Sequence, residues 1–269
     1  MSGSTDKPIR PTEAEIRAGG FSTPWDAPMT PPFPFTFRNV EVLTAVYRTD
    51  PDAIARLLPP PLEPTSDKVL IHIYRMGDVD WLGPYGESNV MIGARMANGG
   101  ISGGYSPYLF LNHPVGIVQG REVHGQPKKY AEPSLTTAGD TVVGRITRDG
   151  IDVMTLTAPY KQRQGDLTAL QEHFDFRINL NLKAVEHIDG RPAIRQITAR
   201  KLSDVTIHEC WRGPCTVELR PHVQAPIYRL PVIEAIEGFH WRADFTLVPG
   251  DIIYDYLADE NAQKGEMGA

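Results

Sequence analysis

Short segments in which hydrophobic and polar residues alternate follow one another along most of the chain, and this pattern favours β-strands over helices. The segment 40–47 is an example, because it alternates and is rich in β-branched residues that suit a half-buried strand. Further strands are predicted at residues 69–76, 87–96, 105–111, 205–209, 217–219 and 239–247. The chain is therefore expected to consist mainly of β-structure.

Two Asp-Gly dipeptides, at residues 149–150 and 189–190, predict tight hairpins between further strands. Asp-Gly is a strong hairpin signal, because the common two-residue turn needs positive φ at both of its central positions. The strands predicted on either side of these turns are 142–147, 151–157, 178–185 and 193–198.

Only short helices are predicted. One begins after Thr49-Asp50-Pro51, since a polar cap followed by proline suits a first helical turn. A second runs from Asn112, which can cap it, to Gly125, which can end it, although two internal glycines weaken this prediction. A third helix is predicted at 251–257.

Many strands, few helices and no alternation of strand and helix predict a mainly β protein with a few short helices (α+β). The strands are expected to form an antiparallel barrel that is closed or nearly closed. The proline-rich segment 1–34 is interpreted as an extended N-terminal arm, 35–257 as a single barrel domain and 258–269 as a flexible tail.

Composition excludes several classes of function. The 269 residues carry a net charge of −6 without any basic run, which argues against a nucleic-acid partner. No apolar run approaches the roughly 20 residues of a membrane span, and no secretory signal is visible, so a cytoplasmic location is expected. Cys210 and Cys215 are then expected to be reduced structural thiols. The histidines show no metal-binding spacing, and no phosphate loop occurs, so no metal or cofactor is predicted.

Two adjacent lysines, Lys128 and Lys129, follow Pro127 directly after the second predicted helix. A lysine amine attacks a carbonyl only when it is unprotonated, and burial or a neighbouring positive charge lowers its pKa enough to allow this. The pair alone is weak evidence, since two lysines on a solvated turn would look the same.

Five separated motifs add to this evidence. They are Val46-Tyr47-Arg48-Thr49-Asp50, Tyr85-Gly86-Glu87-Ser88, Gly120-Arg121-Glu122 leading to Pro127-Lys128-Lys129, Asp204-Val205-Thr206-Ile207-His208-Glu209 with Trp211 and Gly213-Pro214, and Ile252-Ile253-Tyr254-Asp255-Tyr256-Leu257. With these motifs in this order, the chain resembles the acetoacetate decarboxylase superfamily over residues 33–257. The resemblance implies a cone-shaped β-barrel in a homo-oligomer, a tetramer or larger.

The resemblance also implies roles for three residues. Lys128 would form a Schiff base with a small keto acid. Lys129 would lower the pKa of Lys128 or hold its loop, and Glu87 would be the active-site glutamate. The alternative for Glu87 is an exposed carboxylate at a strand edge.

Two positions depart from the family. Val40 stands where these decarboxylases carry an arginine, and His72 replaces a second carboxylate. Arg38 lies two residues from Val40 on the same face of a strand, so it is a candidate to replace the missing positive charge. His72 would suit proton transfer because the ordinary pKa of histidine is near neutral, although a structural role is equally compatible with the sequence.

Further candidates for substrate binding are Tyr85, Gln119 and Tyr254, for each of which plain packing is an equal alternative. The departures at Val40 and His72 favour an aldolase, dehydratase or hydratase acting on a 2-oxo acid. Decarboxylation of acetoacetate is the first alternative, and a barrel that binds a ligand without turnover is the second.

Overall fold

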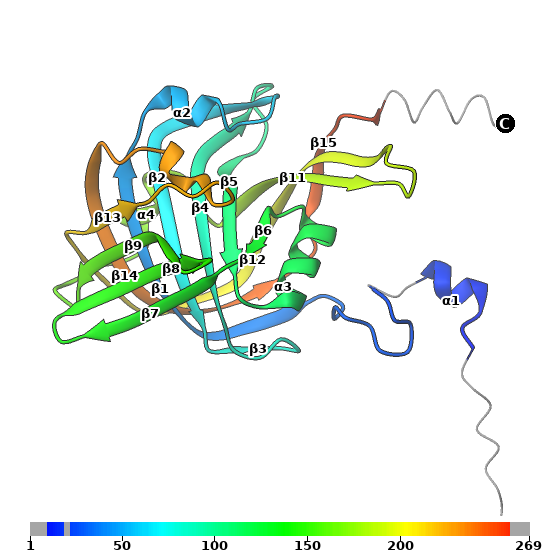
Figure 1. Ribbon diagram of the computed structural model, residues 1–269, viewed down its shortest axis with the longest axis horizontal. Helices are drawn as coiled ribbons and strands as arrows, with labels where there is room; N and C mark the ends of the chain where they lie inside the picture. Colours follow the sequence, from blue (N-terminus) through cyan, green and yellow to red (C-terminus); the bar gives the residue numbers. More distant parts are fainter. Residues whose placement is uncertain (1–9, 19–21, 259–269) are drawn as a thin grey trace, which may run out of the picture.

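The computed structural model describes residues 10–18 and 22–258 and is dominated by strands (Figure 1). The strands are β1 (Phe35–Arg48), β2 (Leu62–Met76), β3 (Asp78–Val79), β4 (Tyr85–Met96), β5 (Ser102–Leu111), β6 (Lys128–Tyr130), β7 (Glu132–Ala138), β8 (Thr141–Arg148), β9 (Ile151–Pro159), β10 (Arg163–Gln164), β11 (Ile178–Glu186), β12 (Pro192–Gly213), β13 (Thr216–Leu219), β14 (Glu234–Leu247) and β15 (Asp251–Asp255). The helical segments are α1 (Glu13–Ala18), α2 (Pro51–Ala55), α3 (Pro114–Gln119), the π-helical turn η1 (Gly120–His124), α4 (Thr168–Gln171) and the 3₁₀ turn η2 (Pro226–Arg229). No helix in these described ranges is long and apolar enough to cross a membrane.

The larger sheet closes on itself. Its neighbouring strands run in the order β12, β11, β5, β4, β2, β1 and β14, and β14 pairs again with β12. Within this ring only β5 and β11 pair in parallel, and all other neighbours are antiparallel. The prediction of a mainly β, nearly closed antiparallel fold is therefore confirmed.

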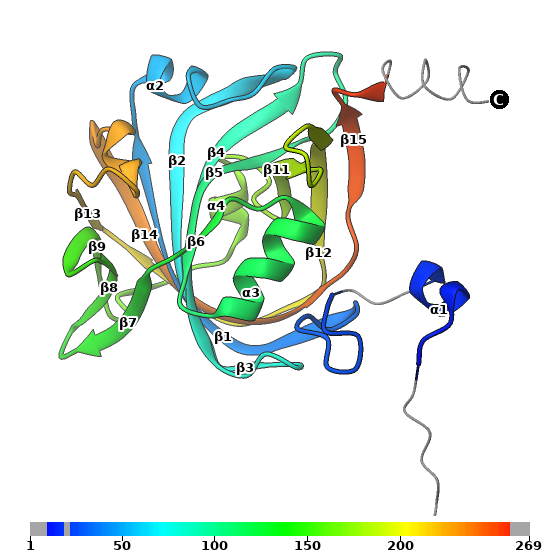
Figure 2. The ribbon, with the colours of Figure 1, turned by 45° about the vertical axis from the view of Figure 1, so that its right-hand side comes forward.

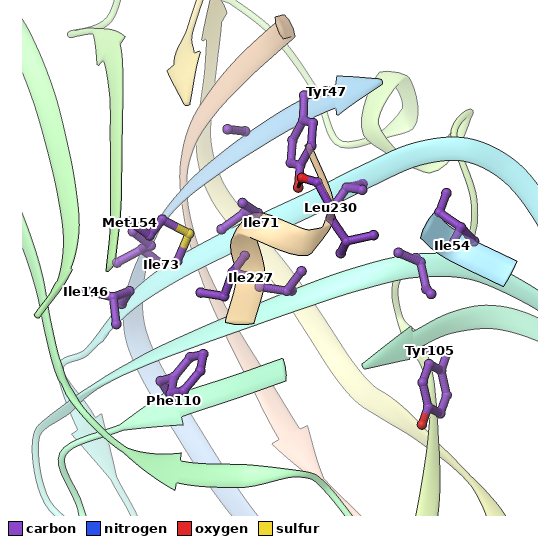
Figure 3. Packing of buried hydrophobic residues seen from close by; sticks show 14 of the residues in the cluster. Tyr47, Ile54, Ile71, Ile73, Tyr105, Phe110, Ile146, Met154, Ile227 and Leu230 are labelled. Atoms are coloured by element: carbon purple, nitrogen blue, oxygen red, sulfur yellow. Dashed lines mark hydrogen bonds between the residues drawn. The ribbon is translucent and has the colours of Figure 1, made fainter. Parts of the chain in front are cut away.

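A second sheet, in the order β13, β9, β8 and β7, covers the outside of the ring (Figure 1). Gly144 of β8 allows the two sheets to approach closely, since a Cβ there would lie 2.7 Å from Cδ1 of Ile73 on β2. Figure 3 shows the packing between them, where Ile73 lies close to Ile146 and Met154 of the outer sheet.

Strand β1 shows how one strand contributes to two cores. Leu43 and Tyr47 pack in the cluster between the two sheets, whereas Val42 and Val46 belong to the cluster inside the ring. Successive side chains on a strand point to opposite faces, so a strand covered on both faces becomes apolar throughout. The predicted strand 40–47 is therefore buried on both faces and not half-buried as its alternation suggested.

The hairpin predicted at residues 149–150 is confirmed, with φ of 51° at Asp149 and 78° at Gly150 joining β8 to β9. The hairpin at 189–190 also occurs and joins β11 to β12, with positive φ at Gly190. The segments predicted as separate strands at 193–198 and 205–209 belong to one 22-residue strand, β12. Register shifts near Asp204, which has a φ of 51°, bend this strand without ending it.

Other predicted elements need correction. Residues 251–255 form strand β15 and not a helix, because they pair with residues 196–199 at the free edge of β12. The helix predicted after Asn112 is present, but His113 caps it by accepting a hydrogen bond from the Gly116 amide. Asn112 instead accepts one from the Gly86 amide.

Within the predicted extended arm, residues 13–18 form the helix α1, and 1–9 and 19–21 lie outside the described residues. The same holds for the predicted tail beyond Ala258.

Candidate active site

The helix α3 and the turn η1 pack against the ring beside β6, β11 and β12 (Figure 2). A small cavity lies inside the ring. Its volume is about 60 Å³, several times the roughly 10–15 Å³ that one water molecule needs. The apolar lining residues, called the apolar wall below, are Phe37, Met76, Met91, Phe176, Leu202, Trp241, Phe245 and Leu247. The other lining residues, called the polar wall below, are Tyr74, Tyr85, Glu87, Asn89, Gln126, Lys128, Asn179 and Arg200.

Lys128 lies in the polar wall because β6 pairs in parallel with β5, with Leu109 opposite Lys128. Its side chain is buried, and its Nζ lies 3.1 Å from Oε2 of Glu87, whose side chain is only 10% exposed. Glu87 comes from the neighbouring strand β4. The structure therefore brings together two of the predicted site residues as an enclosed ion pair.

The turn η1 packs directly against the stem of this lysine. A Cβ on Gly120 would lie 2.4 Å from Cδ and 2.7 Å from Cε of Lys128, so a larger residue would displace the side chain. Arg121 donates a hydrogen bond of 3.2 Å to the Lys128 carbonyl oxygen. Gly125 ends the turn with a φ of 77°, a conformation that glycine adopts without strain. The glycine that weakened the helix prediction is thus needed to make room for the lysine.

Two tyrosines border Glu87. Burial, together with the nearby Glu87 carboxylate, raises the pKa of Tyr85 well above its ordinary value. The same causes, in the same order, raise the pKa of Tyr74. Both phenols therefore stay protonated near neutral pH and can donate hydrogen bonds into the cavity. This places the predicted candidate Tyr85 in the cavity wall.

Lys129 faces the opposite side of β6, as strand alternation requires. Its ammonium donates hydrogen bonds of 3.2 and 2.9 Å to the main-chain and side-chain oxygens of Gln224. Burial and the charges of Arg148 and Arg121 lower its pKa. Lys129 is not among the residues that line the cavity, and its contacts tie β6 to the loop that carries Gln224.

His72 does not line the cavity but contacts two residues that do. It is fully buried, its ring contacts the cavity residues Tyr74 and Phe176, and its Nδ1 lies 2.8 Å from Oγ1 of Thr44. Burial lowers its pKa to about 3. The near-neutral pKa that suggested proton transfer is therefore absent in the folded protein.

The remaining predicted candidates lie away from the cavity lining. Gln119 is buried at the end of α3, and its Nε2 has no hydrogen-bond partner among the described residues. Arg38 is partly exposed and pairs with Asp78 and Asp80, the latter at 2.7 Å, so it does not replace the charge missing at Val40. Tyr254 is 40% exposed on β15.

Sequence reasoning missed Arg200, Gln126 and Asn179 in the polar wall. Arg200 lies on β12 two residues before the cavity residue Leu202, so both share the inward face. This two-residue spacing is the signal in the sequence that could have identified Arg200. Using it requires knowing which face of β12 points inward. The cavity lining thus contains a cationic side chain, Arg200, 160 positions after Val40.

By fold, the chain is a closed-ring β protein that resembles a solved acetoacetate decarboxylase with a TM-score of 0.85 and 35% identity, covering 91% of this chain and 99% of the other. The family model "Acetoacetate decarboxylase (ADC)" matches residues 21–257, and the chain belongs to that family. "Acetoacetate decarboxylase 2" of Mesorhizobium japonicum is 38% identical over 242 residues, covering 90% of this chain and 92% of the relative. "Acetoacetate decarboxylase" of Paraburkholderia xenovorans is 36% identical over 247 residues, covering 92% and 97%. The predicted family is confirmed, and these relatives favour the reaction that the sequence interpretation ranked second.

The buried histidines generate a prediction about stability. Burial lowers the pKa of His72 and of His124 to about 3, whereas unfolded histidine has a pKa of about 6.5. Between these values the unfolded chain binds more protons than the folded one. The free energy of unfolding is therefore expected to fall as pH drops below about 6.5, by about 1.4 kcal/mol per pH unit for each histidine.

Urea unfolding between pH 4.5 and 7.5 measures this dependence. The variant His72→Gln keeps a polar side chain of similar reach but cannot titrate, so its slope is expected to be smaller by the contribution of one histidine. Equal slopes for the two proteins would contradict a neutral, enclosed His72.

Proposed function

We propose that the protein is a lyase that decarboxylates a small 3-oxo acid, acetoacetate or a close analogue, through a Schiff base on Lys128. The observation that carries the proposal is the enclosed contact of 3.1 Å between Nζ of Lys128 and Glu87. An amine at a cavity wall, with a proton acceptor in contact, is what imine formation requires. The names of the relatives support acetoacetate as the substrate.

The reaction begins when Glu87 takes a proton from the Lys128 ammonium. The free amine then attacks the ketone carbon, and loss of water gives a cationic imine. The bond between the α-carbon and the carboxylate breaks, and its electron pair moves through the α-carbon to the imine nitrogen, which leaves carbon dioxide and a neutral enamine. Protonation of the α-carbon and hydrolysis of the imine release the ketone and restore Lys128.

The apolar wall favours the bond-breaking step. The cationic imine loses its charge as the enamine forms, so surroundings with little water destabilise the charged imine and favour this step. Phe176 and Trp241 are among the lining residues that supply such surroundings. The phenols of Tyr74 and Tyr85, which stay protonated, are placed to donate hydrogen bonds to the departing water.

The size of the cavity favours decarboxylation over the aldol-type reactions that the sequence favoured. A volume of about 60 Å³ corresponds to a few water-sized positions, which suits one short oxo acid. An aldol reaction needs a second carbonyl compound beside the imine. The pKa of His72 is too low for proton exchange near neutral pH, so this histidine does not supply the proton transfer that the aldol-type reactions would use. A barrel that merely binds a ligand would have no use for a buried lysine paired with a carboxylate.

Carbon dioxide release from acetoacetate tests the proposal. The wild-type protein is expected to release carbon dioxide, and Lys128→Ala to lose at least about a thousandfold in kcat/KM, since covalent catalysis supplies much of the barrier reduction. Lys129→Gln removes the adjacent amine on the outer face and is expected to retain activity within about tenfold. Comparable turnover by Lys128→Ala and wild type would overturn the mechanism.

The contact between Gly120 and Lys128 gives a second prediction. Gly120→Ala is expected to lower kcat for carbon dioxide release by at least about tenfold, because the added Cβ displaces the reactive side chain. Gly116→Ala is the matched control, since its Cβ would contact Leu111 and not the lysine. If Gly120→Ala lost no more activity than Gly116→Ala, the close packing would be irrelevant to catalysis.

A further inference from the structure

Arg200 enters the cavity from β12 and lies beside Asn179, its partner in the pairing of β11 with β12. The Arg200 side chain is part-buried, and burial lowers its pKa from the ordinary value. Arginine nevertheless stays charged near neutral pH because its ordinary pKa is so high. The cavity therefore contains a permanent cation in addition to the amine of Lys128.

This cation makes no direct ion pair in the described part of the chain, although the Glu87 carboxylate partly offsets the effect of burial on its pKa. No carboxylate oxygen there lies within 4.0 Å of the Arg200 nitrogens, and the buried Nε has no hydrogen-bond partner. Its nearest polar contact is a hydrogen bond of 3.3 Å from Nη2 to Oδ1 of Asn179. Glu87, the carboxylate of the cavity wall, is already in contact with Lys128. A buried charge without a partner is costly, so the site is built to receive an anion.

A hydrogen-bond network holds the guanidinium in place. The Asn179 amide nitrogen donates to Oγ of Ser106 at 2.7 Å and to the Gly104 carbonyl oxygen at 3.2 Å. This fixes the amide so that its oxygen accepts from Arg200 and also from Nε2 of Gln126, at 3.2 Å. The arginine is therefore oriented before any ligand arrives, which reduces the entropy lost on binding.

We propose that Arg200 binds the carboxylate of the oxo acid while Lys128 engages its carbonyl. This inference rests on the proposed function for the identity of the anion. One carboxylate would balance the excess positive charge of Lys128, Glu87 and Arg200 taken together. A guanidinium can hold a carboxylate through two parallel hydrogen bonds, which fixes the orientation of a short acid.

The contact would select oxo acids over neutral ketones of the same size. It would also assist product release, since carbon dioxide and the remaining ketone carry no charge for Arg200 to hold. Specificity of this kind arises because the uncharged competitor leaves the buried cation unpaired.

Ligand binding without turnover isolates the proposed contact. Butanoate carries the carboxylate but no ketone, and butanamide is its uncharged analogue of the same shape. Ligand-observed NMR titrations would give the Kd of each for the wild type, Arg200→Gln and Arg200→Lys. A surface control is Arg95→Gln, since Arg95 is exposed and pairs with Glu63.

The wild type is expected to bind butanoate at least tenfold more tightly than butanamide. Arg200→Gln should lose this preference while its Kd for butanamide stays unchanged, which shows that the cavity is intact. Arg200→Lys should keep part of the preference, and Arg95→Gln all of it. Equal butanoate affinity in wild type and Arg200→Gln, or no preference in the wild type, would overturn the proposal.

Carbon dioxide release separates this inference from the proposed function. If the wild type prefers butanoate through Arg200 but releases no carbon dioxide from acetoacetate, the anion site stands and the decarboxylase proposal fails. If acetoacetate is decarboxylated with the same KM by wild type and Arg200→Gln, the decarboxylase stands and the role of Arg200 fails.

Discussion

The contact between Lys128 and Glu87 is the interaction on which the site depends. Two opposite charges, both nearly shielded from solvent, are stable in such a place only when they are paired closely. The pair therefore requires that β4 and β6 both border β5, and that the stem of the lysine has room beside η1. The parallel pairing of β6 with β5 and the absence of a side chain at Gly120 meet these two requirements.

The ring can enclose a cavity beside this pair because much of its hydrophobic packing lies on its outer face, against the second sheet. The outer sheet covers one face of β1 and β2, and residues such as Leu43, Ile71 and Ile73 form a core outside the ring. Figure 3 shows Tyr47 in this core, where its hydroxyl donates to the Leu230 carbonyl oxygen. The interior of the ring can then retain a cavity whose polar wall carries Lys128, Glu87 and Arg200. The core between the two sheets and the cavity thus lie on opposite faces of the same strands.

Local signals in the sequence predicted much of the fold. The turn at Asp149-Gly150 was predictable because its backbone conformation follows from two residues alone. Strand β15 was not predictable from its own residues. This short segment of mixed polarity becomes a strand because it pairs with the free edge of β12. Lys128 and Glu87 were predicted from motifs, and the structure brings them into contact. Arg200 was missed because a single arginine in a long strand gives no indication of which face points inward.

The most direct test of the account is to locate the covalent intermediate. The protein would be incubated with acetoacetate, reduced with borohydride and digested, and the modified peptide identified by mass spectrometry. The account predicts one reduced adduct per chain, on Lys128 and not on Lys129, because only Lys128 reaches the cavity. An adduct on Lys129, or turnover of acetoacetate without any trapped adduct, would contradict it.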